Sequence, residues 1–270
     1  MPEGHTLHRL AKLHDKRFAG GRVRVSSPQG RFAAGAALID GRVLTRAEAW
    51  GKHLLHHYDS GVTLHIHLGL YGKFTESAVP IDAPVGEVRM RLIGAGRTGE
   101  AHGTDLRGPA ACEILHDPEV AALTARLGPD PLRRDADPDR AFARIQRSQR
   151  PIGALLMDQK VLAGVGNVYR AEVLFRQGIS PHLAGKSLSR TEWDAMWTDL
   201  TELMPIGVRR GKMHVVRPEH DHGAPSYAAD RPRTYVYRRV GEPCRVCGTP
   251  VLHAVMEARN LFWCPTCQPA

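Results

Sequence analysis

Four of the five cysteines in this 270-residue chain form two CxxC pairs near its C-terminus. Cys244 and Cys247 form the first pair, sixteen residues follow, and Cys264 and Cys267 form the second pair. Two such pairs at this spacing can present four thiolates tetrahedrally to one zinc ion, whereas a redox dithiol is the weaker alternative. The pattern therefore predicts a hairpin stapled by one structural Zn²⁺. We expect the fifth cysteine, Cys112, to be a small buried apolar residue.

A closed four-thiolate site supports structure but has no open position for a substrate. Such a hairpin can, however, hold out a basic side chain, and Arg259 lies between the two cysteine pairs. The chain has a formal net charge of +9, spread along its whole length. This sign suits a polyanionic partner, because each Lys or Arg placed on a phosphate releases condensed counterions. Binding of nucleic acid is therefore one expectation to test against the other motifs.

The first half of the chain has the pattern of a β domain with one helix. Pro2 and Glu3 suit the first turn of a helix over 3–17, since proline tolerates the first position and a carboxylate favours the positive helix end. Residues 21 to about 116 alternate apolar and polar side chains, with a hairpin-type turn at DSG, 59–61. This pattern predicts an antiparallel β-sandwich on which the helix packs.

Helical periodicity dominates the second half of the chain until about residue 213. We expect helices over 151–163 and 168–177, each followed by a glycine, and a third helix capped by Ser187 or Ser189. Residues 214–233 have no such period and are expected to form a long polar loop.

Several further residues each have two interpretations. In GVGN, Asn167 can cap the following helix, or the exposed N–H groups can hold a phosphate. Lys52, before the hairpin, can be a plain edge lysine or a phosphate contact. Leu70 and Tyr71, between two glycines, can cover a core or wedge into a base stack. Five histidines crowd the hairpin, and packed or solvated imidazoles are favoured there over a metal site: His53, His56, His57, His65 and His67.

Five features now stand in order: PEG at the start, GK before a hairpin, GVGN between helices, two CxxC pairs and an arginine between them. Together they resemble the formamidopyrimidine-DNA glycosylase/endonuclease VIII family, from Pro2 to Gln268. LGPDPL, GVGNVYRAEVLF and RRVGEPCRVCGTP…CPTCQ are specific to that family. The resemblance implies an α+β multidomain fold with DNA bound in a basic cleft. Its parts would be an N-terminal antiparallel β-sandwich (1–117), a linker (118–131), a helical domain with a helix–two-turns–helix element (132–233) and a zinc finger (234–270).

The same resemblance assigns roles to residues. Pro2, once Met1 is removed, corresponds to the nucleophile, and Glu3 corresponds to the general acid. The catalytic set that it implies is Pro2, Glu3, Lys52 and Arg259. The DNA contacts that it implies are Asn167, Arg259, Lys52, Leu70 and Tyr71.

The chemistry explains why these residue types are needed. An α-amino group has a pKa of about 8, so a useful fraction is neutral at physiological pH. A secondary amine that attacks C1′ of a nucleotide gives an iminium ion, which makes the C2′ proton acidic and lets the 3′-phosphate leave by β-elimination. A second elimination can expel the sugar remnant. A neighbouring carboxylic acid such as Glu3 can protonate the ring oxygen as the sugar opens.

Two departures from the family pattern bear on specificity. His5 stands where proline is usual, and Thr6 stands where a second glutamate is usual. HLGLYG resembles the endonuclease VIII branch, and the phenylalanine of the guanine-specific branch is missing from 106–112. We therefore expect a bifunctional glycosylase/AP lyase that prefers oxidised pyrimidines. The alternatives are a glycosylase for 8-oxoguanine and formamidopyrimidine, a DNA-binding zinc protein without catalysis, and an RNA-binding zinc-ribbon protein.

The expected partner is damaged DNA, and the expected state is a monomer. No apolar run approaches the roughly 18 residues of a membrane span, and no secretory signal pattern opens the chain. We therefore expect a cytoplasmic protein that is associated with the nucleoid through DNA.

Overall fold

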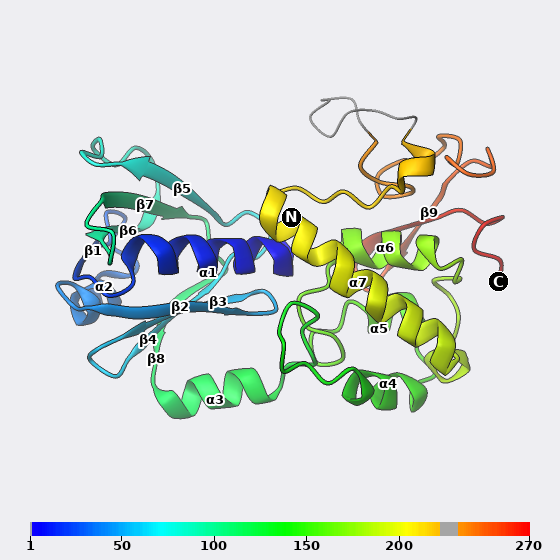
Figure 1. Cartoon of the computed structure of the whole chain (residues 1–270), viewed down its shortest axis with the longest axis horizontal. Helices are drawn as coiled ribbons and strands as arrows, with labels where there is room; N and C mark the ends of the chain where they lie inside the picture. The colour runs from blue at the N-terminus through cyan, green and yellow to red at the C-terminus, as the bar shows by residue number, and fades with distance from the viewer. Residues whose placement is uncertain (1, 222–231) are drawn as a thin grey trace. The chain divides into compact units, whose positions relative to one another are not determined.

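The computed structural model describes residues 2–221 and 232–270. The chain divides into two compact units, 1–126 and 127–270, which are traced in Figure 1. Their boundary falls inside the expected linker 118–131, whose first half is helical. The two units are described one after the other.

The first unit is a β-sandwich, as expected. Its two four-stranded antiparallel sheets have the strand orders β1-β6-β7-β5 and β2-β3-β4-β8. The strands are β1 (Val23–Ser26), β2 (Leu44–Trp50), β3 (His53–Tyr58), β4 (Thr63–His67), β5 (Lys73–Ala78), β6 (Val88–Ala95), β7 (Ala101–Arg107) and β8 (Ala111–Leu115). The helices are α1 (Gly4–Phe18), α2 (Ala33–Ile39) and α3 (Asp117–Ala125).

The apolar periods of the sequence explain this core. Strand β6 buries every second residue at its start, and its Met90 and Leu92 join one cluster with Leu54 and Leu64 of the other sheet. The turn predicted at DSG joins β3 to β4 and is confirmed. Helix α1 adds a buried stripe to the same cluster and packs against β2 and β3.

The second unit is helical and ends in a hairpin. Its helices are α4 (Pro138–Gln146), α5 (Ile152–Leu155), α6 (Asn167–Arg176) and α7 (Arg190–Arg210), with 3₁₀ turns η1 (Gly185–Ser187) and η2 (Pro218–His220). The hairpin pairs β9 (Leu252–Met256) with β10 (Arg259–Trp263). Helix α7 begins with the predicted cap at Ser189, whose hydroxyl accepts the N–H of Glu192. Of the expected loop 214–233, residues 222–231 lie outside the described part.

The helix predicted over 151–163 is wrong beyond its first turn. The cause is side-chain competition for the backbone after α5. The amide of Gln159 donates to the carbonyls of Met157 and Val165 at 3.0 Å each, and its oxygen accepts the N–H of Gly164. Together with the carboxylate of Asp158, which accepts the N–H of Lys160 at 3.0 Å, this side chain fixes an irregular turn where the apolar period indicates helix.

Helix α6 is the central element of the second unit. Every residue from 167 to 175 is buried. One side of the helix joins the helical core through Tyr169, Val173 and Leu174, and the other joins a second cluster with the hairpin through Ala171 and Phe175. Within the described ranges, no helix is both long enough and apolar enough to cross a lipid bilayer.

Candidate functional site

Helix α1 runs antiparallel to strand β2. After the helix ends, the N–H of Gly20 donates to the carbonyl of Leu44 at 2.8 Å, at the start of β2. Within the last turn of the helix, the carboxylate of Asp15 accepts the N–H of Ala47 at 3.0 Å, in the middle of β2. The beginning of α1 therefore lies toward the end of β2.

This direction brings the N-terminus to the turn that carries Lys52. From Asp15 back to Glu3 the helix covers about 18 Å at its usual rise, and from Ala47 to Lys52 the strand covers about 17 Å. Both therefore reach the same end of the first unit, as Figure 1 shows. Glu3 is the fully buried N-cap of α1, with its carbonyl accepting a backbone N–H at 2.8 Å, whereas Pro2 and Lys52 are half-buried.

The two residues that depart from the family pattern lie in the first turn of α1. His5 is 5% exposed, and burial lowers the pKa of its imidazole to about 4. Its Nε2 lies 3.4 Å from the hydroxyl of Thr6. A neutral imidazole and a hydroxyl therefore stand close to the chain start at neutral pH.

The histidines of the β3–β4 hairpin form hydrogen-bonded chains. Nδ1 of His53 lies 2.8 Å from Nε2 of His65, whose Nδ1 lies 2.9 Å from the carboxylate of Glu113. Burial lowers the pKa of His53 to about 3, with further lowering by His65, His67 and nearby cations. These imidazoles are therefore neutral at pH 7 and are tied to the sheet.

The loop between β4 and β5 projects two large apolar side chains. Leu70 is 41% exposed and Tyr71 is 86% exposed. The following turn requires glycine, because a Cβ on Gly72 would lie 2.3 Å from the carbonyl oxygen of Leu68. The loop therefore holds Tyr71 out into solvent at a fixed place on the sandwich.

The four cysteines of the CxxC pairs meet as predicted. Their sulfur atoms all lie within 4.8 Å of one another, with Cys244 and Cys267 at 3.9 Å and Cys247 and Cys264 at 3.5 Å. A zinc–sulfur bond of about 2.3 Å in a tetrahedron gives sulfur–sulfur distances of about 3.8 Å, so the geometry fits one Zn²⁺. Hydrogen bonds from Thr249, together with Cys264 and Cys267, lower the pKa of Cys247 to about 6, whereas burial raises the pKa of Cys264 and of Cys267.

Arg259 begins strand β10, directly after the hairpin turn. The two turn residues, Glu257 and Ala258, have positive φ of 51° and 56°, as in a type I′ turn. Arg150 holds this turn through the carboxylate of Glu257 at 2.9 Å. The half-buried Arg259 therefore lies at the tip of the β9–β10 hairpin, whose base is held by the four-cysteine site.

Asn167 is not the N-cap of α6, contrary to one of the two interpretations. Gly166 caps the helix in an extended conformation, and Asn167 is its first residue. The side-chain amide of Asn167 binds the hairpin instead, because Nδ2 donates to the carbonyl of Asn260 at 2.8 Å. Its Oδ1 accepts from Arg170 of the same helix. One N–H of the Nδ2 group has no acceptor among residues 2–221 and 232–270, so the amide keeps one donor.

Sequence reasoning missed two charged residues of α6. Arg170 and Glu172 are both fully buried. The Glu172 carboxylate accepts the backbone N–H groups of residues 235, 236 and 237 at 2.6, 3.0 and 2.8 Å. The available signal was two opposite charges in a helix that is otherwise apolar on every side, which indicates internal partners.

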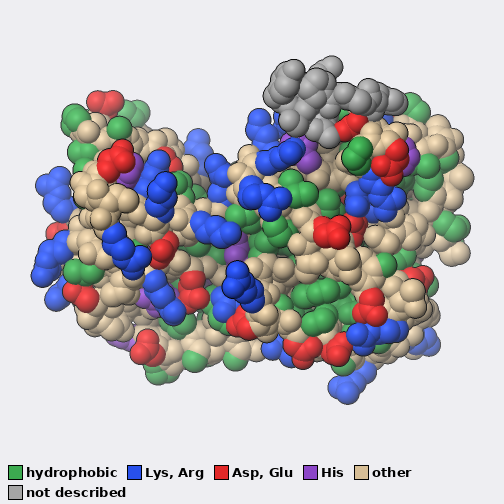
Figure 2. Space-filling model, viewed as in Figure 1, with side chains coloured by type: hydrophobic (Ala, Val, Ile, Leu, Met, Phe, Trp, Pro, Cys, Tyr) green, Lys and Arg blue, Asp and Glu red, His purple; other side chains and the backbone are tan. Residues whose placement is uncertain are grey.

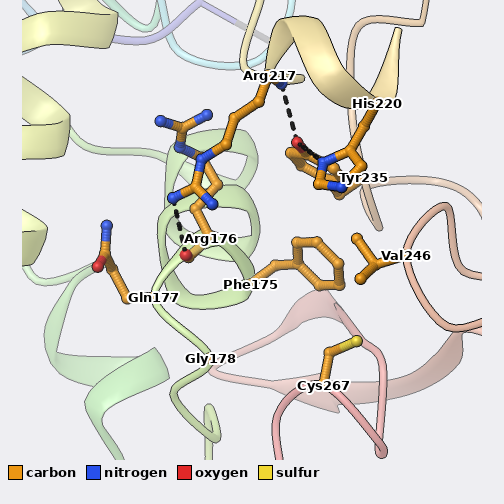
Figure 3. Close-up of a pocket in the computed structure, with 9 residues that line it drawn as sticks. All are labelled: Phe175, Arg176, Gln177, Gly178, Arg217, His220, Tyr235, Val246 and Cys267. Atoms are coloured by element: carbon orange, nitrogen blue, oxygen red, sulfur yellow. Dashed lines mark hydrogen bonds between the residues drawn. The ribbon is translucent and has the colours of Figure 1, made fainter. Parts of the chain in front are cut away.

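A hollow of about 320 Å³ lies at the C-terminal end of α6 (Figure 3). Arg176 contributes to its wall, but Asp199 neutralises that guanidinium at 2.6 Å. Arg217 donates to the carbonyl of Arg176 at 3.2 Å, as the close-up shows. The lining residues are Phe175, Arg176, Gln177, Gly178, Arg217, His220, Tyr235, Val246 and Cys267.

Basic side chains are spread over the surface. Figure 2 shows Lys and Arg on both units of the face that it draws, interspersed with acidic side chains. This distribution matches the net charge of +9, which no single segment explains.

Comparisons with known proteins agree with this arrangement. Three family models match: the formamidopyrimidine-DNA glycosylase N-terminal domain over 1–112, the formamidopyrimidine-DNA glycosylase H2TH domain over 127–218, and the zinc finger found in FPG and IleRS over 241–270. Endonuclease 8 1 of Mycobacterium tuberculosis is 64% identical over 99% of this chain and 100% of its own length. A formamidopyrimidine-DNA glycosylase of Thermus thermophilus is 34% identical over 86% of this chain and 85% of its own length.

Solved structures share the fold. The crystal structure of the Thermus thermophilus formamidopyrimidine-DNA glycosylase has a TM-score of 0.75 at 29% identity, covering 99% of this chain and 98% of that one. The Lactococcus lactis formamidopyrimidine-DNA glycosylase, bound non-covalently to DNA that contains an AP site, has a TM-score of 0.79 at 20% identity. That alignment covers 99% of this chain and 100% of the other, and it supports the fold alone.

Proposed function

Because the chain belongs to the formamidopyrimidine-DNA glycosylase/endonuclease VIII family of base-excision repair glycosylases, we propose that it is bifunctional, excising an oxidised base and then cleaving the abasic site. The observation that carries the proposal is the shared position of the start of α1 and the Lys52 turn at one end of the sandwich. The secondary amine of Pro2, the buried carboxyl group of Glu3 and the cation of Lys52 can then act on the same nucleotide.

The reaction begins at the nitrogen of Pro2 after removal of Met1. The neutral amine attacks C1′, the N-glycosidic bond breaks and the base leaves with a proton. Glu3 protonates the ring oxygen as the sugar opens, and an iminium ion joins Pro2 to C1′. Loss of the C2′ proton then expels the 3′-phosphate, and a second elimination or hydrolysis frees Pro2.

The remaining predicted residues bind and deform the DNA. Lys52 contacts the phosphate at the lesion, and Asn167 and Arg259 hold further phosphates of the same strand. Leu70 and Tyr71 fill the place of the extruded base. Extrusion costs a few kcal/mol of lost stacking and pairing, and it costs least for a damaged base. The exposure of both side chains and the spare N–H of Asn167 support these assignments.

We further propose that oxidised pyrimidines are preferred over 8-oxoguanine. The support is the higher identity to endonuclease 8 than to the glycosylases named for formamidopyrimidine, together with the Leu-Tyr pair in one loop. Excision from duplexes that carry thymine glycol or 8-oxoguanine, at equal concentration, tests this preference. Faster excision of 8-oxoguanine would reverse the assignment.

Borohydride trapping on a duplex with one abasic site tests the lyase step. The purified protein is expected to give a covalent adduct, because hydride reduces the iminium ion to a stable amine. Pro2→Gly should reduce trapping by at least tenfold, whereas Lys12→Met, on the same helix, should leave it unchanged. No adduct, or an equal adduct with Pro2→Gly, would contradict the proposal.

A further inference from the structure

Arg170 is a fully buried arginine that takes no part in the proposed glycosylase and lyase steps. We propose that Arg170 is a positioning residue that sets the place of Arg259 by holding the main chain of β10. The inference rests on the proposed contact between Arg259 and a DNA phosphate. It adds a residue that touches no substrate but determines how well that contact is made.

The contacts of Arg170 join three segments. Its Nη2 donates to the carbonyl of Asn260 at 3.2 Å and to Oδ1 of Asn167, while its Nη1 donates to the carbonyl of Gly153 at 3.2 Å. Asn260 directly follows Arg259, and its carbonyl also accepts from Asn167 at 2.8 Å. Two side chains of α6 therefore grip one peptide group next to Arg259.

The pairing of the hairpin leaves this carbonyl available. Arg259 pairs with Met256 beside the two-residue turn, and Asn260 pairs with Val255. Antiparallel pairs alternate between hydrogen-bonded and non-hydrogen-bonded, and the pair that flanks a two-residue turn is hydrogen-bonded, so the next pair, Asn260 and Val255, directs its carbonyls outward. The outer edge of a two-stranded sheet has no third strand, and α6 supplies the donors that such a strand would provide.

A guanidinium suits this task better than other donors. Its planar fork points two nitrogens at different carbonyls at once, as it does here for residues 153 and 260. An ammonium group has its donors on one atom and cannot span both acceptors in the same way. The prediction is therefore that lysine replaces Arg170 only in part.

Other anchors keep the finger in place without Arg170. Glu172 binds the backbone of 235–237, and Phe262 packs in one cluster with Phe175 of α6. Loss of Arg170 should therefore loosen the tip of the hairpin while the zinc site stays folded. This separates a positioning role from a general structural role.

The first experiment measures binding of Arg170→Met to a duplex with a tetrahydrofuran abasic analogue over a range of salt. Loss of a charged hydrogen-bond donor should weaken binding about tenfold. The slope of log affinity against log salt should become shallower by about one, because the phosphate contact of Arg259 is lost. Zinc content should stay at one ion per chain. Arg190→Met, an exposed arginine paired with Asp139 and Asp194, is the matched control and should change affinity less than twofold.

The deciding experiment is a double-mutant cycle with Arg259→Ala. If Arg170 acts through Arg259, the double variant should bind as Arg259→Ala does, within a factor of two. Fully additive losses would overturn the inference. A salt slope unchanged by Arg259→Ala would instead overturn the phosphate contact itself. If Arg170→Met loses zinc, Arg170→Lys takes its place in the same cycle, with the same two outcomes.

Discussion

At the residue scale, burial fixes the charge state of several histidines in the sandwich unit. Burial holds the pKa of His53 near 3 and that of His5 near 4, and the fully buried His56 is also well below its usual range. Nδ1 of His14 lies 3.0 Å from Nε2 of His56, and Nε2 of His14 lies 3.1 Å from Glu76. The imidazole of His14 thus links α1 to β3 of one sheet through His56 and to β5 of the other through Glu76.

The lowered pKa values make this unit sensitive to acid. An unfolded histidine binds a proton below about pH 6.5, whereas folded His53 does so only near pH 3. The unfolded state therefore binds more protons between those values, and stability is lost as pH falls through this window. From pH 7 to pH 5, His53 alone should cost about 2 kcal/mol of unfolding free energy.

Urea unfolding of His53→Gln at pH 7, 6 and 5 measures this contribution. The natural protein should lose about 2 kcal/mol more than the variant between pH 7 and pH 5. His253→Gln, at an exposed position in the hairpin, should follow the natural protein. Parallel pH profiles for His53→Gln and the natural protein would show that His53 is not buried in neutral form.

Local motifs identified some residues but not their partners. Pro2, Glu3 and the four cysteines stand in short patterns, and the sulfur atoms of the cysteines do meet in space. The partner of Asn167 lies 93 residues away, on an edge strand, and is a backbone carbonyl. No side-chain pattern marks such an acceptor, so the sequence supported two interpretations of Asn167 and missed Arg170.

At the element scale, α6 ties the helical core to the zinc finger. Its buried Glu172 anchors the finger by accepting three backbone N–H groups on one carboxylate. Burial raises the pKa of Glu172, and the three N–H groups oppose that rise. Like a helix cap, the carboxylate satisfies backbone N–H groups, but here they belong to a bent loop segment instead of a helix.

Glu172→Gln tests this anchor. The amide has one acceptor oxygen and turns its NH₂ group toward a backbone N–H, which leaves at least one buried donor unpaired. The free energy of unfolding of the second unit should fall by about 2–3 kcal/mol. Glu242→Gln, at an exposed acid of the same region, should cost less than about 1 kcal/mol. Equal midpoints in thermal unfolding for both variants would show that Glu172 is not an anchor.

The helices differ in how far their sequences predict them. α6 and α7 have clear starts and apolar periods, and both were expected near their observed bounds. The segment after α5 has the same period, yet Gln159 binds the backbone on both sides of itself and prevents helix. A long polar side chain can satisfy a turn in ways that an apolar period does not reveal.

At the scale of the whole molecule, folding of the C-terminal hairpin in the second unit depends on the four-cysteine zinc site. The hairpin is short, and its core is shared with α6. A two-stranded hairpin is marginal in water, so the metal supplies much of the free energy that folds it. The sandwich unit has its own core, which contains none of the four zinc-site cysteines, so we expect it to fold without the metal.

Removal of zinc should therefore abolish DNA binding while the sandwich stays folded. Chelation is expected to change the fluorescence of Trp263, which precedes Cys264, and added Zn²⁺ should restore both signal and binding. Cys247→Ser should mimic chelation, whereas Cys112→Ser should keep one zinc per chain. Full DNA affinity in the zinc-free protein would contradict this dependence.

The architecture could be predicted because each part has its own local signature. Strand alternation, helical periods and cysteine spacing each refer to one segment, and the sandwich and the zinc hairpin agree with them. The joins between segments could not be predicted in this way. They depend on buried polar groups whose partners are distant in sequence. The Glu172 carboxylate, for example, accepts backbone N–H groups more than sixty residues away.

The grip of α6 on the finger involves main-chain atoms on the side of the finger. The polar atoms held are the carbonyl of Asn260 and the N–H groups of residues 235–237, so these hydrogen bonds do not depend on the side chains of the finger, whereas the packing of Tyr235 and Val236 against α6 does. Such a contact tolerates mutation at exposed finger positions such as Asn260, but not at the polar residues of α6 or at the buried Tyr235 and Val236. Libraries that vary the exposed hairpin positions can therefore seek new substrate preferences, provided that the polar residues of α6 are left unchanged.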